Sequence, residues 1–280
     1  SHAYQRSSFS IAASVLAGEG TGMERDYDFT SAVHAEDLDG PAQVGKSAGE
    51  RAVRRLNPQR PETAQVPVIY DPRVSKSLVG HLASAINGSA VARGTTFLKE
   101  KMGERLFAEN ITITDDPLRR RGMRSKPFDA EGVATTRRNI IEDGVLSSWI
   151  LDLGSARQLG LQTTGNASRG PSSTPGPAAT NLFLGAGTQT PRELMADIKS
   201  GFYVTELIGF GVNIVTGDYS RGASGFWIEN GEITYPVSEI TVAGNLSDIF
   251  ANISAANDLE FRYGTDAPTL RVDGMTVAGA

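Results

Sequence analysis

One octapeptide near the N-terminus has the residue types and spacing of a nucleotide-binding loop. Residues 40–47 read GPAQVGKS and match the pattern G-x-x-x-x-G-K-S/T, in which backbone N–H groups and a lysine hold phosphate. That chemistry needs a buried strand before the loop and a helix after it. Here Glu36, Asp37 and Asp39 precede the loop, and three carboxylates make a poor strand and repel a triphosphate. Although 66–71 could imitate a magnesium-binding strand, the sequence favours an ordinary helix start.

Side chains that could bind a catalytic metal are few. The chain has no cysteine, and its only histidines are His2, His34 and His81, none of which lie four or five residues apart. A catalytic zinc usually takes three protein ligands and keeps a fourth position open. Scattered carboxylates would have to complete such a site. We therefore predict that His81 is an ordinary helix residue, and that the chain has no metal site and no cofactor of its own.

Positive charge is concentrated in one segment, 119–126, which reads RRRGMRSK and runs from Arg119 to Lys126. Arginine suits phosphate groups, so the segment could contact nucleic acid. No aromatic residues are interleaved with the charges to stack on bases. The pattern favours a solvated loop.

Three serines, Ser168, Ser220 and Ser224, stand in glycine-rich surroundings and are the candidates for a nucleophile. None of them fits the G-x-S-x-G elbow, and no histidine is near them in sequence. The sequence therefore disfavours a serine hydrolase, although it does not show which residues meet in space.

The elements that must position these residues follow from hydrophobic periodicity and turn signals. Asn230-Gly231 separates two strand-like runs, and this dipeptide tolerates the positive φ angles of a tight hairpin. The dipeptide Asp143-Gly144 gives the same hairpin signal upstream. The two hairpins suggest a large, mostly antiparallel sheet, and the intervening helical patterns make the fold class α+β.

Periodicity predicts the following elements. Strands are expected at about 7–17, 24–32, 65–70, 111–114 and 269–277, helices at about 41–56, 73–86, 190–199 and 246–256, a hairpin over 137–150, and a Gly/Ser/Thr/Pro loop over 162–180. The first helix is expected to bury one side, made of Val44, Ala48, Ala52, Val53 and Leu56.

Composition sets broader limits. With 280 residues, 39% of them hydrophobic, the chain can bury a sizeable core, and 27 basic against 32 acidic residues give a net charge of −5. This charge gives no general attraction to nucleic acid or anionic membranes. No run approaches the roughly 20 apolar residues of a membrane span. The absence of cysteine, which rules out disulfides, suggests a reducing cytoplasm. Because a strand pattern begins within the first ten residues, we expect a further N-terminal domain to be missing.

Several segments together carry a family resemblance. Residues 200–207, 216–223, 226–231 and 240–245, supported by 23–27, 164–167 and 270–279, resemble the C-terminal region of the TldD/PmbA family, and within it the PmbA/TldE branch, long labelled a modulator of DNA gyrase. The resemblance covers essentially residues 1–280 as a single C-terminal-type domain. It implies a subunit of a cytoplasmic two-subunit metalloprotease that trims or degrades unfolded peptides.

The resemblance also implies where zinc belongs. In the TldD subunit an H-E-x-x-x-H helix supplies two histidines and a glutamate base, and a cysteine supplies the third ligand. The same frame in this chain reads KSLVGH, so that His81 is retained while Lys76 and Ser77 replace the first histidine and the glutamate. A protonated lysine repels Zn²⁺, and a serine cannot activate its water as a carboxylate does. The resemblance thus implies a non-catalytic, zinc-less subunit with a TldD-type zinc-bearing partner.

Other functions remain open. The family's older name and segment 119–126 leave room for a regulator associated with DNA gyrase or nucleic acid, although nucleic acid is not the expected partner. A self-sufficient peptidase with an unorthodox site is the other alternative. If the partner hypothesis holds, an extended peptide is the expected substrate, and the isolated subunit could form a homodimer. Loop 162–180 is then either a border of the peptide cleft or a plain surface loop.

Overall fold

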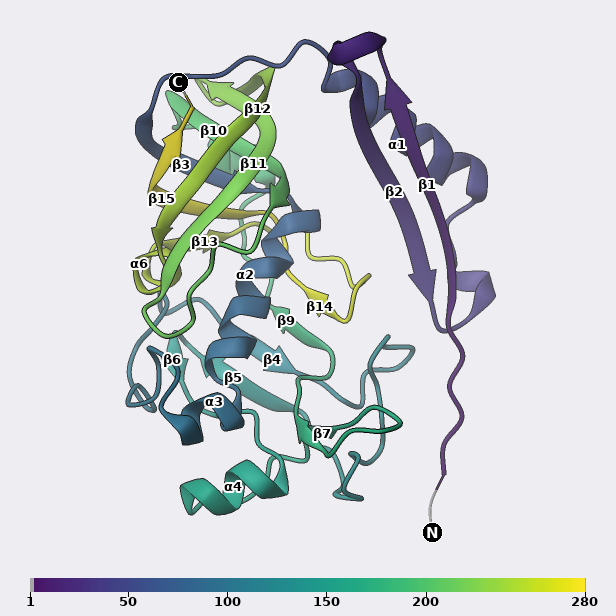
Figure 1. Ribbon diagram of the computed structural model, residues 1–280, viewed down its shortest axis with the longest axis vertical. Helices are drawn as coiled ribbons and strands as arrows, with labels where there is room; N and C mark the ends of the chain where they lie inside the picture. The colour runs from purple at the N-terminus through teal and green to yellow at the C-terminus, as the bar shows by residue number, and fades with distance from the viewer. Residues whose placement is uncertain (1–2, 280) are drawn as a thin grey trace.

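The first part of the chain forms a hairpin covered by one helix. The structure is a computed structural model and describes residues 3–279. Strands β1 (Phe9–Ala17) and β2 (Glu24–Ala32) pair antiparallel along their whole length, and α1 (Pro41–Arg54) packs across them (Figure 1). Short 3-10 turns occur at Gly20–Gly22 and Ala35–Asp37. Both predicted strands and the predicted helix are confirmed.

The buried face of α1 is narrower than periodicity predicts. Val44, Ala48 and Ala52 are buried at intervals of four residues, whereas Val53 is 59% exposed. Each helical residue is turned about 100° from the last, so Val53 points away from the face that contains Ala52. Leu56 lies beyond the helix end and is half-buried.

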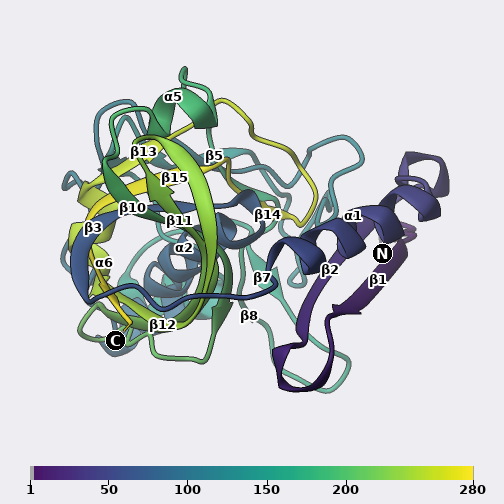
Figure 2. The ribbon, with the colours of Figure 1, turned by 90° about the horizontal axis from the view of Figure 1, so that it is seen from above.

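The main body contains a small closed barrel. Its strands are β3 (Ala64–Tyr70), β10 (Ser200–Ile208), β11 (Asp218–Glu229), β12 (Glu232–Asn245) and β15 (Leu270–Ala278), with β13 (Ile253–Ala255) added beside β15. The order is β12-β11-β10-β3-β15-β13, and β12 also pairs with β15, which closes the ring seen from above in Figure 2. Only β3 and β10 pair in parallel within this sheet.

A second sheet lies below the barrel. It is formed by β4 (Ile113–Asp115), β5 (Arg138–Glu142), β6 (Val145–Leu146), β9 (Leu182–Leu184) and β14 (Thr265–Asp266), in the order β14-β9-β4-β5-β6. The two predicted hairpins therefore belong to different sheets, and the single large sheet inferred from them was wrong. Both turns themselves are confirmed, because Asn230, Gly231, Asp143 and Gly144 all have positive φ angles.

Helix α2 (Pro72–Ala85) connects the two sheets. It lies between them (Figure 1) and buries Leu78, Val79 and Leu82 in the shared core. The remaining helices are α3 (Gly88–Arg93), α4 (Leu153–Leu159), α5 (Pro191–Met195) and α6 (Leu246–Ala251), and the loop after α4 contains the short pair β7 (Ala167–Ser168) and β8 (Gly176–Pro177). The fold class α+β, mostly antiparallel, is confirmed.

Two predicted helices are shorter than expected. The segment 190–199 is helical only over α5, because Ser200 already starts β10. The segment 246–256 ends its helix at Ala251, since Ile253 pairs with Val272 of β15 in the barrel sheet. Pairing with a distant strand thus overrides the local helical pattern. Within residues 3–279, every helix is too short or too polar to cross a membrane.

Candidate functional site

The candidate site lies on α2, where the degenerate zinc frame falls. Asp71 caps the helix, accepting a hydrogen bond from the Arg73 backbone N–H at 2.9 Å, and Pro72 occupies the first helical position. Asp71 also accepts a hydrogen bond from the Tyr203 hydroxyl at 3.1 Å, which attaches the helix start to the barrel. Residues 76–81 therefore lie on a helix that is fixed at its first turn.

Lys76 is held in an aromatic setting. Its Nζ lies 3.1 Å from the centre of the Tyr263 ring and 5.8 Å from that of Phe29 on β2, within the range of cation–π attraction. Burial lowers the pKa of Lys76 to about 8; Asp266 opposes the shift, and the nearby Arg73 and Arg124 add to it. Lys76 thus joins the hairpin to the main body through its cation.

Ser77 is not aimed at a substrate. Its hydroxyl donates a hydrogen bond of 2.6 Å to the carbonyl of Val74, one turn back in the same helix. Serine commonly satisfies its hydroxyl in this way inside helices. The group that stands where the resemblance would place a general base is therefore satisfied locally.

His81 faces a different part of the fold. Its ring meets Tyr219 edge-on, with 5.9 Å between ring centres, and its buried Nε2 has no hydrogen-bond partner among residues 3–279. Burial lowers the pKa of His81 to about 4, and the positive charge of Arg221 contributes. Positions 76 and 81 are turned about 140° apart on a helix, which agrees with the separate surroundings of the two side chains.

These three side chains do not fit a zinc ion. Zinc in proteins takes thiolate, neutral imidazole or carboxylate, whereas the frame offers an ammonium, a hydroxyl bonded within its helix, and an imidazole turned toward Tyr219. In the part of the chain that the structure describes, no three His, Cys, Asp or Glu side chains gather closely enough to hold a metal.

A furrow runs between the hairpin and the main body beside this face of α2. One cavity of about 440 Å³ is lined by Phe29 and Ser31 of β2, by Lys76 and by Tyr263, among others. A neighbouring cavity of about 320 Å³ shares Tyr263 and extends to the start of α2. A third, of about 240 Å³, shares Ser31 and reaches the basic segment 119–121. The furrow is thus bordered by aromatic rings and cations.

Buried ion pairs attach the hairpin unit, formed by β1, β2 and α1, to the barrel side of this furrow. Arg73 lies 2.8 Å from Asp26 on β2, and Arg55, just after α1, lies 2.6 Å from Glu206 on β10 and 3.5 Å from Glu24 on β2. Burial disfavours the charge on Arg73, yet the carboxylates of Asp71 and Asp26 raise its pKa above the usual value. The network therefore fixes the hairpin with charged groups on both sides.

The outer edge of β2 is already occupied in part. The N–H groups of Tyr27 and Phe29 donate to the side chains of Asp26 and Asp28, at 2.7 and 2.9 Å. Carboxylates that cover strand N–H groups block pairing with a further strand. A peptide in the furrow would thus find rings and cations along this part of β2 rather than an open strand edge.

The nucleotide-loop match is an ordinary helix start. Gly40 precedes α1, and its carbonyl accepts hydrogen bonds from the N–H groups of Gln43 and Val44. Lys46 lies within the helix, 3.7 Å from Glu50, with its side chain in solvent. The segment before the loop is a 3-10 turn rather than a strand, so no phosphate cradle forms.

The remaining candidates are separated in space. His34 is exposed at the turn after β2, and His2 lies outside the described residues. Ser168 and Ser220 are exposed and Ser224 is buried; none of them is hydrogen-bonded to a histidine among residues 3–279. No catalytic dyad is assembled around these serines in the part of the chain that is described.

The basic segment is tied to its surroundings. The Arg119 guanidinium lies 3.2 Å from the centre of the Phe261 ring, and Arg121 pairs with Asp37 at 2.5 Å and with Glu36 at 3.3 Å. The segment is a loop with Arg120, Arg121 and Arg124 exposed, as expected, and it also contacts the end of the hairpin unit and borders the furrow.

Sequence reasoning missed the partners that define this site. Phe29 and Tyr263 surround Lys76, and Asp26 pairs with Arg73. No motif marks them, because each lies far in sequence from the helix it contacts. Tyr27 and Phe29, two residues apart on the otherwise polar strand β2, are a local signal that could have pointed to this face.

Comparison with protein families decides the relationship. The model of the PmbA/TldA metallopeptidase C-terminal domain matches residues 63–279, and that of the central domain matches residues 1–56. The chain belongs to the TldD/PmbA family. The boundary between the two models falls just after α1, where the hairpin unit gives way to the barrel.

Relatives in the TldD/PmbA family agree with the branch. The chain is 42% identical to metalloprotease PmbA of Escherichia coli O157:H7, over 96% of this chain and 58% of that protein. It is 38% identical to the PmbA homologue of Haemophilus influenzae, over 99% of this chain and 60% of that protein, but only 29% identical to the TldD homologue of the same organism, over 72% of this chain. The chain spans about 60% of the length of its PmbA relatives.

Solved structures of the family share the fold. A candidate modulator of DNA gyrase from Bacteroides thetaiotaomicron superimposes with a TM-score of 0.88 at 31% identity, covering 98% of this chain and 60% of that chain. TldE from Thermococcus kodakarensis superimposes with a TM-score of 0.86, covering 97% of this chain and 63% of that chain; at 23% identity this likeness concerns the fold alone.

Proposed function

We propose that the chain is the zinc-less, non-catalytic subunit of a cytoplasmic, two-subunit TldD/TldE-type metalloprotease that acts on unfolded peptides. One observation carries the proposal: the zinc-helix frame on α2 holds Lys76 against Tyr263, turns Ser77 back on its own helix and buries His81 Nε2. The name of one relative, metalloprotease PmbA, supports a role in peptide cleavage. A zinc-bearing partner of TldD type would supply the chemistry.

In this proposal the chain shapes the cleft. The furrow between the hairpin and α2 offers rings and cations to an extended peptide, while strand edges elsewhere in the combined sheets could add backbone hydrogen bonds. The ion pairs of Arg73 and Arg55 would keep the furrow's width constant. A wall of fixed shape lowers the ordering cost of binding a flexible substrate.

Co-purification with a TldD-type subunit tests the proposal. The two chains are co-expressed with a tag on this chain only, and zinc and subunit ratio are measured in the purified complex. We expect a stable complex whose zinc follows the partner's content, and Ser77→Ala should leave association and peptide cleavage within about twofold, since that hydroxyl is satisfied within α2. Failure of the two chains to associate would remove the partner role.

The names of the solved relatives favour one second candidate, a role at DNA gyrase. Such a role would need a surface for DNA or for the enzyme. Fluorescence anisotropy with a labelled duplex at about 50 and 200 mM salt tests direct DNA contact, because phosphate binding weakens steeply over that range. Salt-dependent binding that is lost on Arg119→Gln and Arg120→Gln would support this second candidate, and no binding would discard it.

A further inference from the structure

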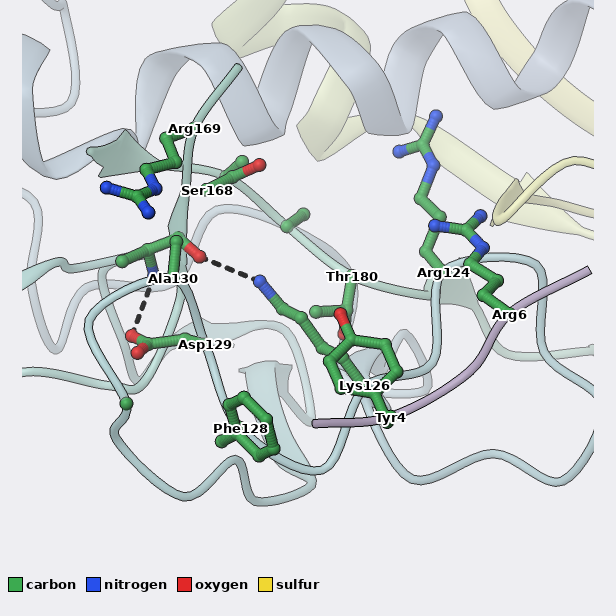
Figure 3. A pocket seen from close by; sticks show the side chains of 14 residues that line it. Tyr4, Arg6, Arg124, Lys126, Phe128, Asp129, Ala130, Ser168, Arg169 and Thr180 are labelled. Atoms are coloured by element: carbon green, nitrogen blue, oxygen red, sulfur yellow. Dashed lines mark hydrogen bonds between the residues drawn. The ribbon is translucent and has the colours of Figure 1, made fainter. Parts of the chain in front are cut away.

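A further cavity lies beside the furrow and has four cations among its lining residues. Its volume is about 730 Å³. The lining residues that matter below are Arg6, Arg124, Lys126, Asp129 and Arg169. Figure 3 shows Arg6 and Arg124 on one side, Arg169 on the opposite side and Lys126 between them. We call this cavity the cationic pocket.

The single carboxylate in the cationic pocket does not neutralise these cations. Asp129 is buried, and its oxygens already accept hydrogen bonds from the N–H groups of Glu131, Val133 and Ala167, at 2.9, 2.9 and 3.0 Å. Within residues 3–279, no ion pair shorter than 4.0 Å is formed by any of the four lining cations, Arg6, Arg124, Lys126 and Arg169. Among the lining residues, four positive charges therefore face one carboxylate, whose hydrogen-bonding capacity serves the backbone.

Most donors of these cations are unused. The Lys126 ammonium has three N–H donors and gives one to the Ala167 carbonyl at 2.8 Å, the dashed line that starts at Lys126 in Figure 3. The Arg124 guanidinium has five N–H donors and gives one to the Thr265 hydroxyl at 3.1 Å. The Arg6 guanidinium likewise gives one N–H to the Met123 carbonyl. Arg169 is exposed and donates to no group in the described part of the chain.

Lys126 is fixed in place before any ligand arrives. Burial lowers its pKa, while Asp129 and Asp115 act in the opposite direction. Asp115 is itself committed, since it accepts hydrogen bonds from Asn166 at 2.8 Å and from Thr180 at 2.7 Å. An anion that enters the cationic pocket would favour the charged form of Lys126 and meet donors already oriented toward it.

We propose that the cationic pocket binds a carboxylate of an extended peptide. The inference rests on the proposed function, because it makes the peptide the source of the anion. Arg124 lines both this pocket and the cavity beside Lys76, so a peptide lying along Phe29 and Tyr263 in the furrow leads directly to it. Tyr4 and Phe128, which meet edge-on at 5.2 Å, add an apolar wall for a neighbouring side chain.

A peptide suits the cationic pocket better than a nucleic acid. A nucleic acid would need cations that follow a repeating backbone, whereas these converge on one cavity and the chain as a whole carries a charge of −5. Arginine forks fit a carboxylate in bidentate fashion. The carboxylate could be the C-terminus or an acidic side chain, and the probes below separate the two.

Fluorescence anisotropy with three N-terminally labelled, unstructured peptides tests the proposal on the isolated chain. One peptide ends in a free carboxylate, the second has the same sequence with a C-terminal amide, and the third is the amide with one internal glutamate. We expect at least about tenfold tighter binding of the first or the third than of the second, since hydrogen bonds to charged groups are the strong ones. Whichever of these two binds tightly identifies the source of the carboxylate.

Arg124→Gln and Arg169→Gln should each weaken binding of the carboxylate peptide about tenfold and leave the amide unchanged. Both side chains are exposed, so the fold should survive, which circular dichroism checks. Arg157→Gln, an exposed arginine on α4 outside the pocket, is the control and should bind as the unchanged chain does. Equal binding of all three peptides, or variants that bind like the unchanged chain, would overturn the proposal.

The proposed function can fail separately. If the complex with a TldD-type subunit forms and cleaves peptides while the three probes bind alike, only the carboxylate site is wrong. If the probes bind as expected but no complex forms, only the partner role is wrong. Binding of a DNA duplex that displaces the carboxylate peptide would reassign the cationic pocket to phosphate and overturn the present inference.

Discussion

Three residues on α2 carry the proposal that this chain has no zinc site of its own. Lys76, Ser77 and His81 occupy the frame that the family resemblance associates with zinc, and each of the first two is engaged by a neighbouring group instead. His81 is the exception, since its buried Nε2 meets only a ring edge. The frame has therefore become part of the packing between α2, the barrel and the hairpin.

The buried imidazole predicts a pH effect on stability. Because the pKa of His81 falls from 6.5 to about 4 on folding, the unfolded chain binds a proton more readily, and stability drops as pH falls below 6.5 toward 4. His81→Leu should reduce this slope by up to about 1.4 kcal/mol per pH unit. Urea unfolding at pH 7.0, 6.0 and 5.0 measures it.

Exposed His34 provides the matched control for that series. His34→Gln should leave the slope of the unchanged chain intact, while carboxylates titrate equally in all three proteins and cancel in the comparison. An identical pH slope for His81→Leu and the unchanged chain would show that the imidazole is protonated as easily in the folded state as in the unfolded one.

Lys76 should titrate far below an ordinary lysine. Its pKa of about 8 follows from burial beside Tyr263 and from the charges of Arg73 and Arg124. Reductive methylation with ¹³C-formaldehyde followed by NMR should show one dimethyl-lysine signal that titrates near pH 8 and is missing from Lys76→Met. Lys46, exposed on α1, serves for comparison. A Lys76 signal that titrates near pH 10 would mean that the ring contacts compensate fully for burial.

At the scale of elements, charged groups attach the hairpin to the body beside the ring contact of Phe29 with Tyr263. Arg73 and Asp26 form a nearly buried pair across this junction. Removing one partner of such a pair leaves an uncompensated charge, so Arg73→Met should lower the free energy of unfolding by about 3 kcal/mol. Lys46→Met, which breaks an exposed pair with Glu50, should cost less than about 0.5 kcal/mol.

Denaturant unfolding of both variants measures these costs, and amide exchange shows where the structure opens. We expect faster amide exchange in β1 and β2 for Arg73→Met, with exchange in the barrel strands unchanged. If Arg73→Met lowers the free energy of unfolding by less than about 1 kcal/mol, Arg55, which lies 3.6 Å from Asp26, is sufficient to compensate the Asp26 carboxylate.

Local elements could be predicted from the sequence, and their assembly could not. Asn230-Gly231 and Asp143-Gly144 predict their hairpins because positive φ is a local property. Closure of the barrel depends on β12 meeting β15 and on β15 meeting β3, and no periodicity reports such distant pairings. In the site, Lys76 was identified by its place in a motif, whereas Tyr263 beside it depends on how the chain returns to α2.

At the scale of the whole molecule, a hairpin unit and a barrel body border a furrow, and within residues 3–279 no three His, Cys, Asp or Glu side chains gather to hold a metal. The hairpin unit and the barrel body match the central and C-terminal domains of the TldD/PmbA family, and the chain spans about 60% of its PmbA relatives. The furrow between the two parts, together with the cationic pocket beside it, is where a substrate would be held. Catalysis would then require a second subunit.

Peptide cleavage by the chain alone and by its complex with a TldD-type subunit is the most direct test. We expect no cleavage by the chain alone, and cleavage by the complex that a zinc chelator abolishes. Cleavage by the chain alone that survives the chelator and is lost on Ser168→Ala, Ser220→Ala or Ser224→Ala would contradict it.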